Sequence, residues 1–128
     1  MIETEYQKAL LKALAVDAVR HRMLAGARPV HWFGRVTGKF ELAKGGWVHP
    51  SIPGQCDLYG IRERDARHFE VELKNVHTPT SAEQVAWAVL CELRGWPHRE
   101  IRVQARESPA ATIERWVKEL REWTQGIA

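Results

Sequence analysis

Residues 69–74, with the sequence FEVELK, alternate apolar with charged side chains at every second position. Successive side chains of a β-strand point to opposite faces, so this pattern predicts a half-buried strand. Phe69, Val71 and Leu73 are predicted to face the core. The other face then carries Glu70, Glu72 and Lys74, and we expect it to hold a chemical site.

A second acid precedes this strand. Asp57 lies fifteen positions before Glu72, just after the turn residues Pro53 and Gly54. Residues 56–61 are predicted to form a strand, and the polar stretch 62–67 links it to the next one. The two strands are therefore expected to pair antiparallel and to carry Asp57 and Glu72.

An acid followed by acid-x-lysine on a strand can hold a divalent metal beside a phosphodiester. Magnesium prefers oxygen ligands and keeps several waters, so two carboxylates and one main-chain carbonyl are sufficient. Asp57, Glu72 and the carbonyl of Leu73 are the predicted ligands. Lys74 is predicted to orient or deprotonate the attacking water and to offset charge on the phosphorus oxygens.

The same residues allow other interpretations. Asp57 can cap a turn while Glu72 and Lys74 form a solvated strand face, which is common in antiparallel sheets. Glu70 shares the charged face, where it either enlarges the metal site or pairs with an arginine.

The remaining pattern alternates helices and strands. Thr4 and Gln7 have capping-box spacing, as do Ser81 and Gln84, and each pair is expected to open a helix. The first helix is expected to reach about Leu24. The predicted further elements are β segments 30–36, 39–43 and 47–48 forming a hairpin, a helix from 81 to 95, a strand 100–105 parallel to 69–74, and a helix that starts at 108–109.

Composition limits the class of protein. The 128 residues suit a single domain, 1–128, that can bury roughly two thirds of its unfolded surface. The two cysteines lack the spacing of zinc ligands or of a disulfide scaffold, and no apolar run is long enough to span a membrane. We therefore expect a cytoplasmic protein without a membrane partner.

The net charge of +3 is compatible with an anionic partner. The six tryptophans favour a dense core or a subunit interface.

Five short motifs occur in an order that resembles the VRR-Nuc branch of the PD-(D/E)XK nuclease superfamily. The resemblance covers about residues 5–103, and Cys56 stands where the superfamily has proline. The motifs are Thr37-Gly38-x-Phe40, Pro53-Gly54-x-x-Asp57-Leu58, Glu72-Leu73-Lys74, Ser81-x-x-Gln84-x-x-Trp87 and Gly95-Trp96.

This resemblance implies an α/β fold of the restriction-endonuclease type, with a mixed β-sheet flanked by helices in the order α-β-β-β-α-β-α. It implies a DNA endonuclease that depends on Mg²⁺, for which Mn²⁺ can substitute, and that uses no organic cofactor. Small members of this kind resemble junction resolvases, so branched, junction or flap DNA is the expected substrate and a homodimer the expected assembly. The host is expected to be a bacterial or phage-infected cell.

The resemblance also assigns residues. Asp57 and Glu72 match the metal-binding acids, Lys74 the catalytic lysine, and Gln84 the glutamine that approaches the active site from the next helix. Glu5 matches an acid of the first helix that joins the metal's ligand shell. Taken alone, Glu5 also suits the helix dipole, and Gln84 also suits a bond back to Ser81.

Four residues are candidates for DNA contacts. Arg35, Lys39 and Lys44 are cations of the predicted hairpin, and His77 follows Lys74 closely.

Two other functions remain open from the sequence. One is a restriction-like endonuclease that cuts a defined DNA sequence, and the other is a DNA-binding or assembly module that has this fold without catalysis.

Overall fold

A four-stranded mixed sheet forms the centre of the protein in the computed structural model, which describes residues 1–36, 40–48 and 52–128. Its strand order is β1-β4-β5-β6, and a separate two-stranded hairpin contains β2 and β3. The strands are β1 Val30–Gly34, β2 Phe40–Glu41, β3 Trp47–Val48, β4 Leu58–Arg62, β5 His68–Lys74 and β6 His98–Arg102. The helices are α1 Glu3–Arg22, α2 Ala82–Arg94 and α3 Pro109–Gly126.

The pairing of the central strands agrees with the sequence pattern. β4 pairs antiparallel with β5, and β5 pairs parallel with β6 across the α2 crossover. Without the short hairpin strands, the elements follow the expected order α-β-β-β-α-β-α. The coarse prediction of an α/β fold with a mixed sheet is therefore confirmed.

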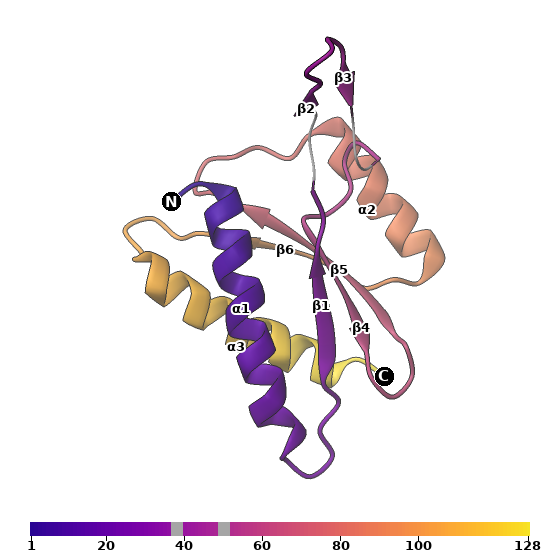
Figure 1. Ribbon diagram of the computed structural model, residues 1–128. Helices are drawn as coiled ribbons and strands as arrows, with labels where there is room; N and C mark the ends of the chain where they lie inside the picture. Colours follow the sequence, from indigo (N-terminus) through magenta and orange to yellow (C-terminus); the bar gives the residue numbers. More distant parts are fainter. Residues whose placement is uncertain (37–39, 49–51) are drawn as a thin grey trace.

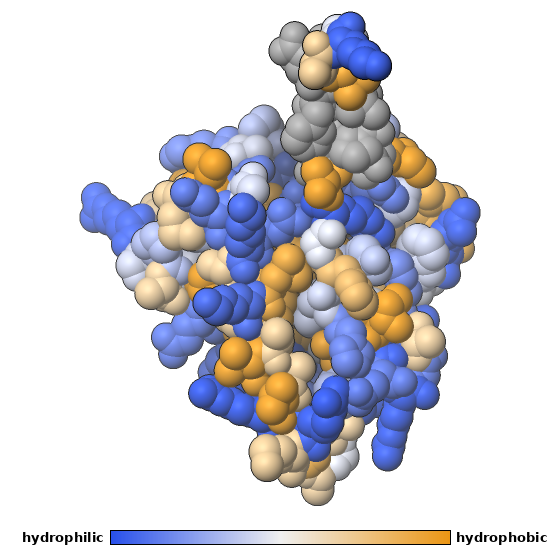
Figure 2. Space-filling view, viewed as in Figure 1, coloured by the Kyte–Doolittle hydropathy of each residue, from blue (hydrophilic) through white to orange (hydrophobic). Residues whose placement is uncertain are grey.

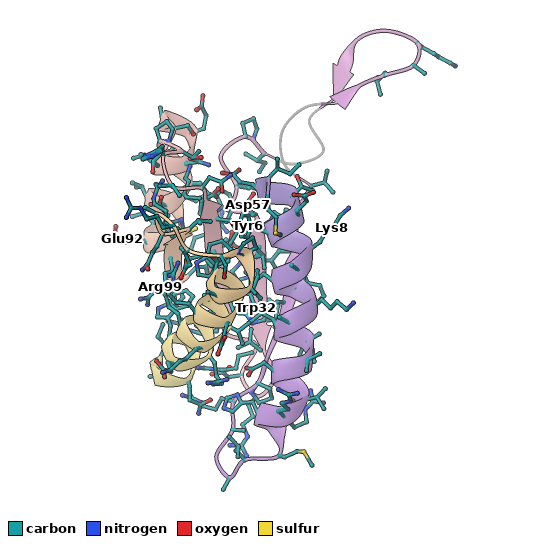
Figure 3. All side chains as sticks on the ribbon, turned by 90° about the vertical axis from the view of Figure 1, so that its left-hand side faces the viewer. Tyr6, Lys8, Trp32, Asp57, Glu92 and Arg99 are labelled. Carbon is teal, nitrogen blue, oxygen red and sulfur yellow. The ribbon has the colours of Figure 1, made fainter. Side chains whose placement is uncertain are left out.

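Helices cover both faces of the sheet. Figures 1 and 3 show α1 on one face and α2 on the other. The larger core joins α1 and α3 to the apolar face of β4, β5 and β6, and a smaller cluster lies beneath α2. The larger core contains Tyr6, Leu10, Leu14, Leu58, Val71, Leu73, Ile101, Val103, Trp116 and Leu120, and the smaller one contains Cys56, Trp87 and Cys91. Both cysteines are free thiols.

The predicted pairing of β1 is wrong. Residues 30–34 do not form a hairpin with the next segment but pair with β4, from Val30 opposite Arg62 to Gly34 opposite Leu58. The physical reason is burial, because Val30 is buried and Trp32 packs against the larger core. Such side chains require a place in the main sheet. The β2–β3 hairpin instead projects from the end of the sheet at which β1 ends and β4 begins (Figure 1).

The first capping box is also wrong. α1 begins at Glu3, and the Glu5 carboxylate accepts a hydrogen bond of 3.0 Å from the Ile2 N–H. Thr4 therefore lies inside the first turn. The second capping box is confirmed, since Ser81 Oγ accepts from the Gln84 N–H at 3.1 Å and Gln84 Oε1 accepts from the Ser81 N–H at 3.0 Å.

The end positions of other elements differ by a few residues. β6 begins at His98 rather than residue 100, because the Glu70 N–H already donates to the Pro97 carbonyl. α2 ends at Arg94, and Gly95 is its C-cap, with a left-handed φ of 70°. Pro109 begins α3, with Ser108 as its N-cap. No helix in the described ranges is long and apolar enough to cross a membrane.

Gly54 fixes the turn before β4 against α2. Its φ is +90°, and a Cβ built there would lie 2.3 Å from the carbonyl oxygen of Glu83 in the α2 backbone. A side chain is excluded both by the left-handed conformation and by this contact. The turn therefore places Cys56 and Asp57 next to the first turn of α2.

We predict that Gly54→Ala lowers the free energy of unfolding by about 2–4 kcal/mol, because backbone must move in addition to the strain of a left-handed alanine. Gly46→Ala is the matched control. Its φ is +84°, but nothing lies within 4 Å of its Cβ position. Its cost should stay near about 1 kcal/mol. Urea unfolding followed by circular dichroism measures both, and equal losses would show that the contact with Glu83 has no importance.

Candidate functional site

Asp57 and Glu72 face each other across β4 and β5. Leu58 is opposite Val71 in the antiparallel register, so one step further along places Asp57 opposite Glu72. Directly opposite residues have Cβ atoms about 4.5–5.5 Å apart. The two carboxyl groups are close enough to share a hydrogen bond when one of them is protonated. When both are ionised, Glu72 Oε2 is buried without a hydrogen-bond donor.

The main chain at Asp57 is held from two directions. Its carbonyl accepts hydrogen bonds from the Arg35 N–H at 2.7 Å and from Gln7 Nε2 at 2.8 Å. Gln7 Nε2 also donates to the Arg35 carbonyl at 3.0 Å. Gly34 permits this approach, because a Cβ there would lie 2.9 Å from Gln7 Nε2. α1 therefore helps to fix the end of β1 and the start of β4 together.

Leu73 presents its main chain to the same place. Its N–H donates to Asp57 Oδ2 at 2.9 Å. The neighbouring residues Lys74 and Glu70 direct their main-chain groups to the β6 side instead. The Lys74 carbonyl accepts from the Val103 N–H, and the Glu70 N–H donates to the Pro97 carbonyl. Since the N–H and C=O of one strand residue point to the same neighbour, the Leu73 carbonyl is directed to the β4 side, past the first residue of that strand.

Gln84 connects Lys74 with Glu72. Its Nε2 donates to Glu72 Oε1 at 3.0 Å, and its Oε1 accepts from Lys74 Nζ. Lys74 is 2% exposed, and its Nζ also donates to the Pro79 carbonyl at 3.0 Å. These two bonds use two of the three N–H donors of the ammonium group. Gln84 therefore serves the helix cap and the site at the same time.

Burial and the neighbouring Asp57 raise the pKa of Glu72 from 4.5 to about 10. Removal from water is the larger cause of this rise, and repulsion by Asp57 adds to it. Attraction by Lys74 lowers the pKa but does not offset these two effects. The pair therefore requires a positive charge between its oxygens, which either a proton or a cation can supply.

The donor set fits a divalent cation. Asp57 and Glu72 provide carboxylate oxygens, Leu73 provides a carbonyl directed to the same side, and Glu72 Oε2 is without a partner. In the described part of the chain, no three side chains of His, Cys, Asp or Glu form a metal-binding group. Two carboxylates with open positions suit Mg²⁺, which keeps several waters. A cavity of about 240 Å³ beneath α2 borders Glu72, Lys74 and Gln84.

Glu70 has a different environment from Glu72 although both lie on the charged face. It is fully buried, and its two oxygens accept hydrogen bonds from Arg35 at 2.6 and 3.0 Å. Trp87 Nε1 donates to it at 3.0 Å, and His68 Nε2 also contacts it. Of the two interpretations of Glu70, the structure contains the arginine pair. The side chain of Arg35 is thereby directed into the protein.

The acid of α1 nearest to the site is Glu3 and not Glu5. Glu5 is exposed and binds the Ile2 N–H, whereas Glu3 Oε1 accepts from the Asn75 N–H at 3.4 Å. The charge of Glu3 also contributes to the raised pKa of Glu72. Helical spacing contains this signal, because Glu3 lies three and seven residues before the buried Tyr6 and Leu10.

The other candidate DNA contacts are at the surface. Lys44 is exposed in the turn of the β2–β3 hairpin, and His77 is exposed in the loop after β5. Arg102 holds that loop by donating to the carbonyls of Asn75 at 2.7 Å and Thr78 at 2.8 Å. Lys39 lies outside the described residues.

No family model matches this chain, and no curated protein or solved structure has a significant match to it. The case for a function therefore depends on the geometry of Asp57, Glu72, Lys74 and Gln84. Figure 3 places Asp57 at the end of the sheet from which the hairpin projects, with α1 on one side and the helix that carries Glu92 on the other.

We predict that Glu72→Gln stabilises the cation-free protein at pH 7–8. The folded pKa of Glu72 is above its ordinary value, so its stabilising contribution is complete below about pH 4.5 and is lost as the pH rises toward about 10. A neutral amide avoids this loss and can donate to Asp57. The expected gain at pH 7–8 in a chelator is about 1–3 kcal/mol, with little gain at pH 4.

Thermal unfolding at both pH values measures this effect. Glu114→Gln, on the exposed side of α3, is the control and should change stability by less than about 0.5 kcal/mol at either pH. An equal change at pH 4 and pH 8 for Glu72→Gln would contradict the assignment of the raised pKa.

Proposed function

We propose that this protein is a divalent-cation-dependent DNA endonuclease that resembles the VRR-Nuc branch and acts on branched, junction or flap DNA. The observation that carries the proposal is the arrangement of Glu72. It faces Asp57 across the sheet, has a buried oxygen that lacks a donor when both acids are ionised, and is joined to Lys74 through Gln84. Two facing acids beside a buried lysine suit a cation and a phosphate.

Asp57, Glu72 and the carbonyl of Leu73 would hold Mg²⁺ or Mn²⁺. When bound, the cation supplies Lewis acidity at the phosphate. The third N–H of Lys74 is available to a water or to a phosphate oxygen, because the other two bind Pro79 and Gln84. Lys74 thereby holds the attacking water and offsets negative charge that develops on the phosphate.

Gln84 acts as a positioning residue. One amide group binds the ammonium of Lys74 and the carboxylate of Glu72, so their separation is set by a rigid planar group. The capping bonds with Ser81 hold this amide in turn. Preorganised polar groups of this kind need little rearrangement during the reaction.

The surface near the site suits a nucleic acid. The hairpin with Lys44 projects from the end of the sheet that carries Asp57, and exposed His77 lies in the loop that follows Lys74. Lys44, His77 and also Lys39 are proposed to contact phosphates. Arg35 instead supports the site from within, through its bonds to Asp57 and Glu70. A homodimer and a cytoplasmic location remain part of the proposal.

Two other functions are distinguishable by experiment. An inert binding module with this fold would keep Glu72 and Lys74 buried, beside Asp57, at a cost in free energy and without a use for them. A restriction-like enzyme would cut plain duplex DNA at one sequence. The burial of Glu72 and Lys74, at 7% and 2% exposure, favours catalysis over the inert module.

We predict that the protein cleaves four-way junction or flap DNA in Mg²⁺ or Mn²⁺ and that a chelator abolishes the cleavage. Asp57→Asn and Lys74→Met should each lower the rate at least about 100-fold, because the first weakens the hold on the cation and the second removes a positive charge that offsets the charge developing on the phosphate. Both changes nearly preserve side-chain size. Gel analysis of labelled substrates gives the rates.

Circular dichroism must show that each variant is folded, and Glu114→Gln serves as an active control. Cleavage that survives the chelator or Asp57→Asn would overturn the mechanism. Binding without cleavage in every metal would favour the inert module. A fixed cut position in plain duplex would favour the restriction-like enzyme.

A further inference from the structure

Four ring side chains form a row on the α2 side of the sheet. They are Phe33 of β1, Tyr59 of β4, His68 of β5, and Trp96, which follows α2. Successive ring centroids are 5.1, 5.9 and 4.2 Å apart, and the angles between the ring planes are 19°, 5° and 27°. The rings are thus nearly parallel across neighbouring strands, in the stacked arrangement that aromatic groups favour.

The row differs from the aromatic groups of the core. Trp116 is fully buried, whereas Phe33 is 44% exposed and Tyr59, His68 and Trp96 are each half-buried. Parallel rings therefore reach the solvent along a line that crosses the sheet. α2 covers the neighbouring part of this face, where its Trp87 and Cys91 pack with Cys56, and leaves the row beside it.

The row begins next to the candidate site. Tyr59 is two residues after Asp57, so both project from the same face about 7 Å apart. Phe33 is directly opposite Tyr59 in the register of β1 and β4. A strand of nucleic acid that reaches Asp57 can therefore place a neighbouring nucleotide against these rings.

Cations accompany the rings. The guanidinium carbon of Arg35 lies 4.6 Å from the centre of the Tyr59 ring, and that of Arg94 lies 5.2 Å from the Trp96 ring. Surfaces for single-stranded nucleic acids combine aromatic rings, on which bases stack, with cation–π contributions from arginine. The chemistry of the row, beside a site proposed to act on DNA, therefore suits nucleobases.

The row has an open end at Phe33, because β1 is an edge strand of the sheet. A cavity of about 270 Å³ lies between α1 and β1, on the opposite face of the sheet from the row. Figure 2 looks onto α1 and β1 and shows hydrophobic surface there among hydrophilic side chains. On the α2 side, the half-exposed Phe33 ring has a strand neighbour only toward β4, so a base can approach it from the edge of the sheet.

We propose that Phe33 stacks an unpaired base of the DNA substrate, with Tyr59, His68 and Trp96 as the rigid support behind it. The inference rests on the proposed nuclease function and specifies the substrate class, which is DNA with an unpaired strand next to the scissile phosphate. Arg35, beside Tyr59, keeps its bonds to Glu70 when the base binds. The row therefore contributes stacking and requires no ion pair to break.

The test measures binding of a 5′- or 3′-flap DNA and of a blunt duplex with the same paired sequence, by fluorescence anisotropy with Ca²⁺ in place of Mg²⁺. One stacked base is worth about 1–3 kcal/mol, so Phe33→Ala should weaken flap binding about 5- to 150-fold. Phe33→Leu, which keeps an apolar group without a ring, should show a similar loss, and Phe33→Trp should show none. Blunt duplex binding should change less than about twofold.

Leu24→Ala, at a 62% exposed position away from the row, is the matched control and should leave flap binding unchanged. As a second readout, 2-aminopurine placed in turn along the unpaired strand should be quenched most at one position, and Phe33→Leu should remove that quenching.

Equal losses on flap and blunt DNA, or no loss for Phe33→Ala, would overturn the stacking site. Failure of the unchanged protein to bind either flap would overturn it as well. Quenching and flap binding that depend on Phe33, without cleavage in Mg²⁺ or Mn²⁺, would leave the stacking site standing and overturn the nuclease proposal alone.

Discussion

Two carboxyl groups that face each other, one of them buried, are the constraint on which the rest of this structure depends. Asp57 and Glu72 repel each other when both are ionised, and burial makes that repulsion stronger. The surrounding bonds all keep the pair in place, since Gln7 fixes the Asp57 main chain, the Leu73 N–H fixes its side chain, and Gln84 fixes Glu72. A protein under selection for stability alone has little reason to keep such a pair, so the arrangement is typical of a functional site.

The elements whose signals are local could be predicted from the sequence. The alternation in β5 and the capping box at Ser81 and Gln84 depend on residues two or three apart, and the structure contains both. The partner of β1 could not be predicted, because alternation shows that a strand has a buried face but not which strand lies beside it. Helical spacing relative to the buried Tyr6 and Leu10 could have shown that Glu3, and not Glu5, lies toward the site. Both acids also suit the first turn of a helix, so their presence there does not distinguish them.

The charged face of β5 shows why one pattern can serve two purposes. Glu70 and Glu72 are both buried acids on that face, yet Glu70 has donors for both oxygens while Glu72 has an oxygen without one. The difference arises from neighbours far away in the chain, Arg35 and Trp87 for Glu70 and Asp57 for Glu72. Periodicity treats the two acids alike, so only the fold separates the structural ion pair from the site.

The bond between Gln7 and Asp57 also has a meaning for folding. It joins residues 50 positions apart, and Glu3 and Asn75 are joined over 72 positions. Such distant contacts form only after much chain entropy has been lost, whereas the α2 cap needs only its own turn. Asp57 and Glu72 lie on one hairpin, but the bonds that hold them from α1 can form only when α1, β1, β4 and β5 have all docked. A chain that is still emerging or partly unfolded lacks the site, so any chemistry that the site performs is restricted to the completed fold.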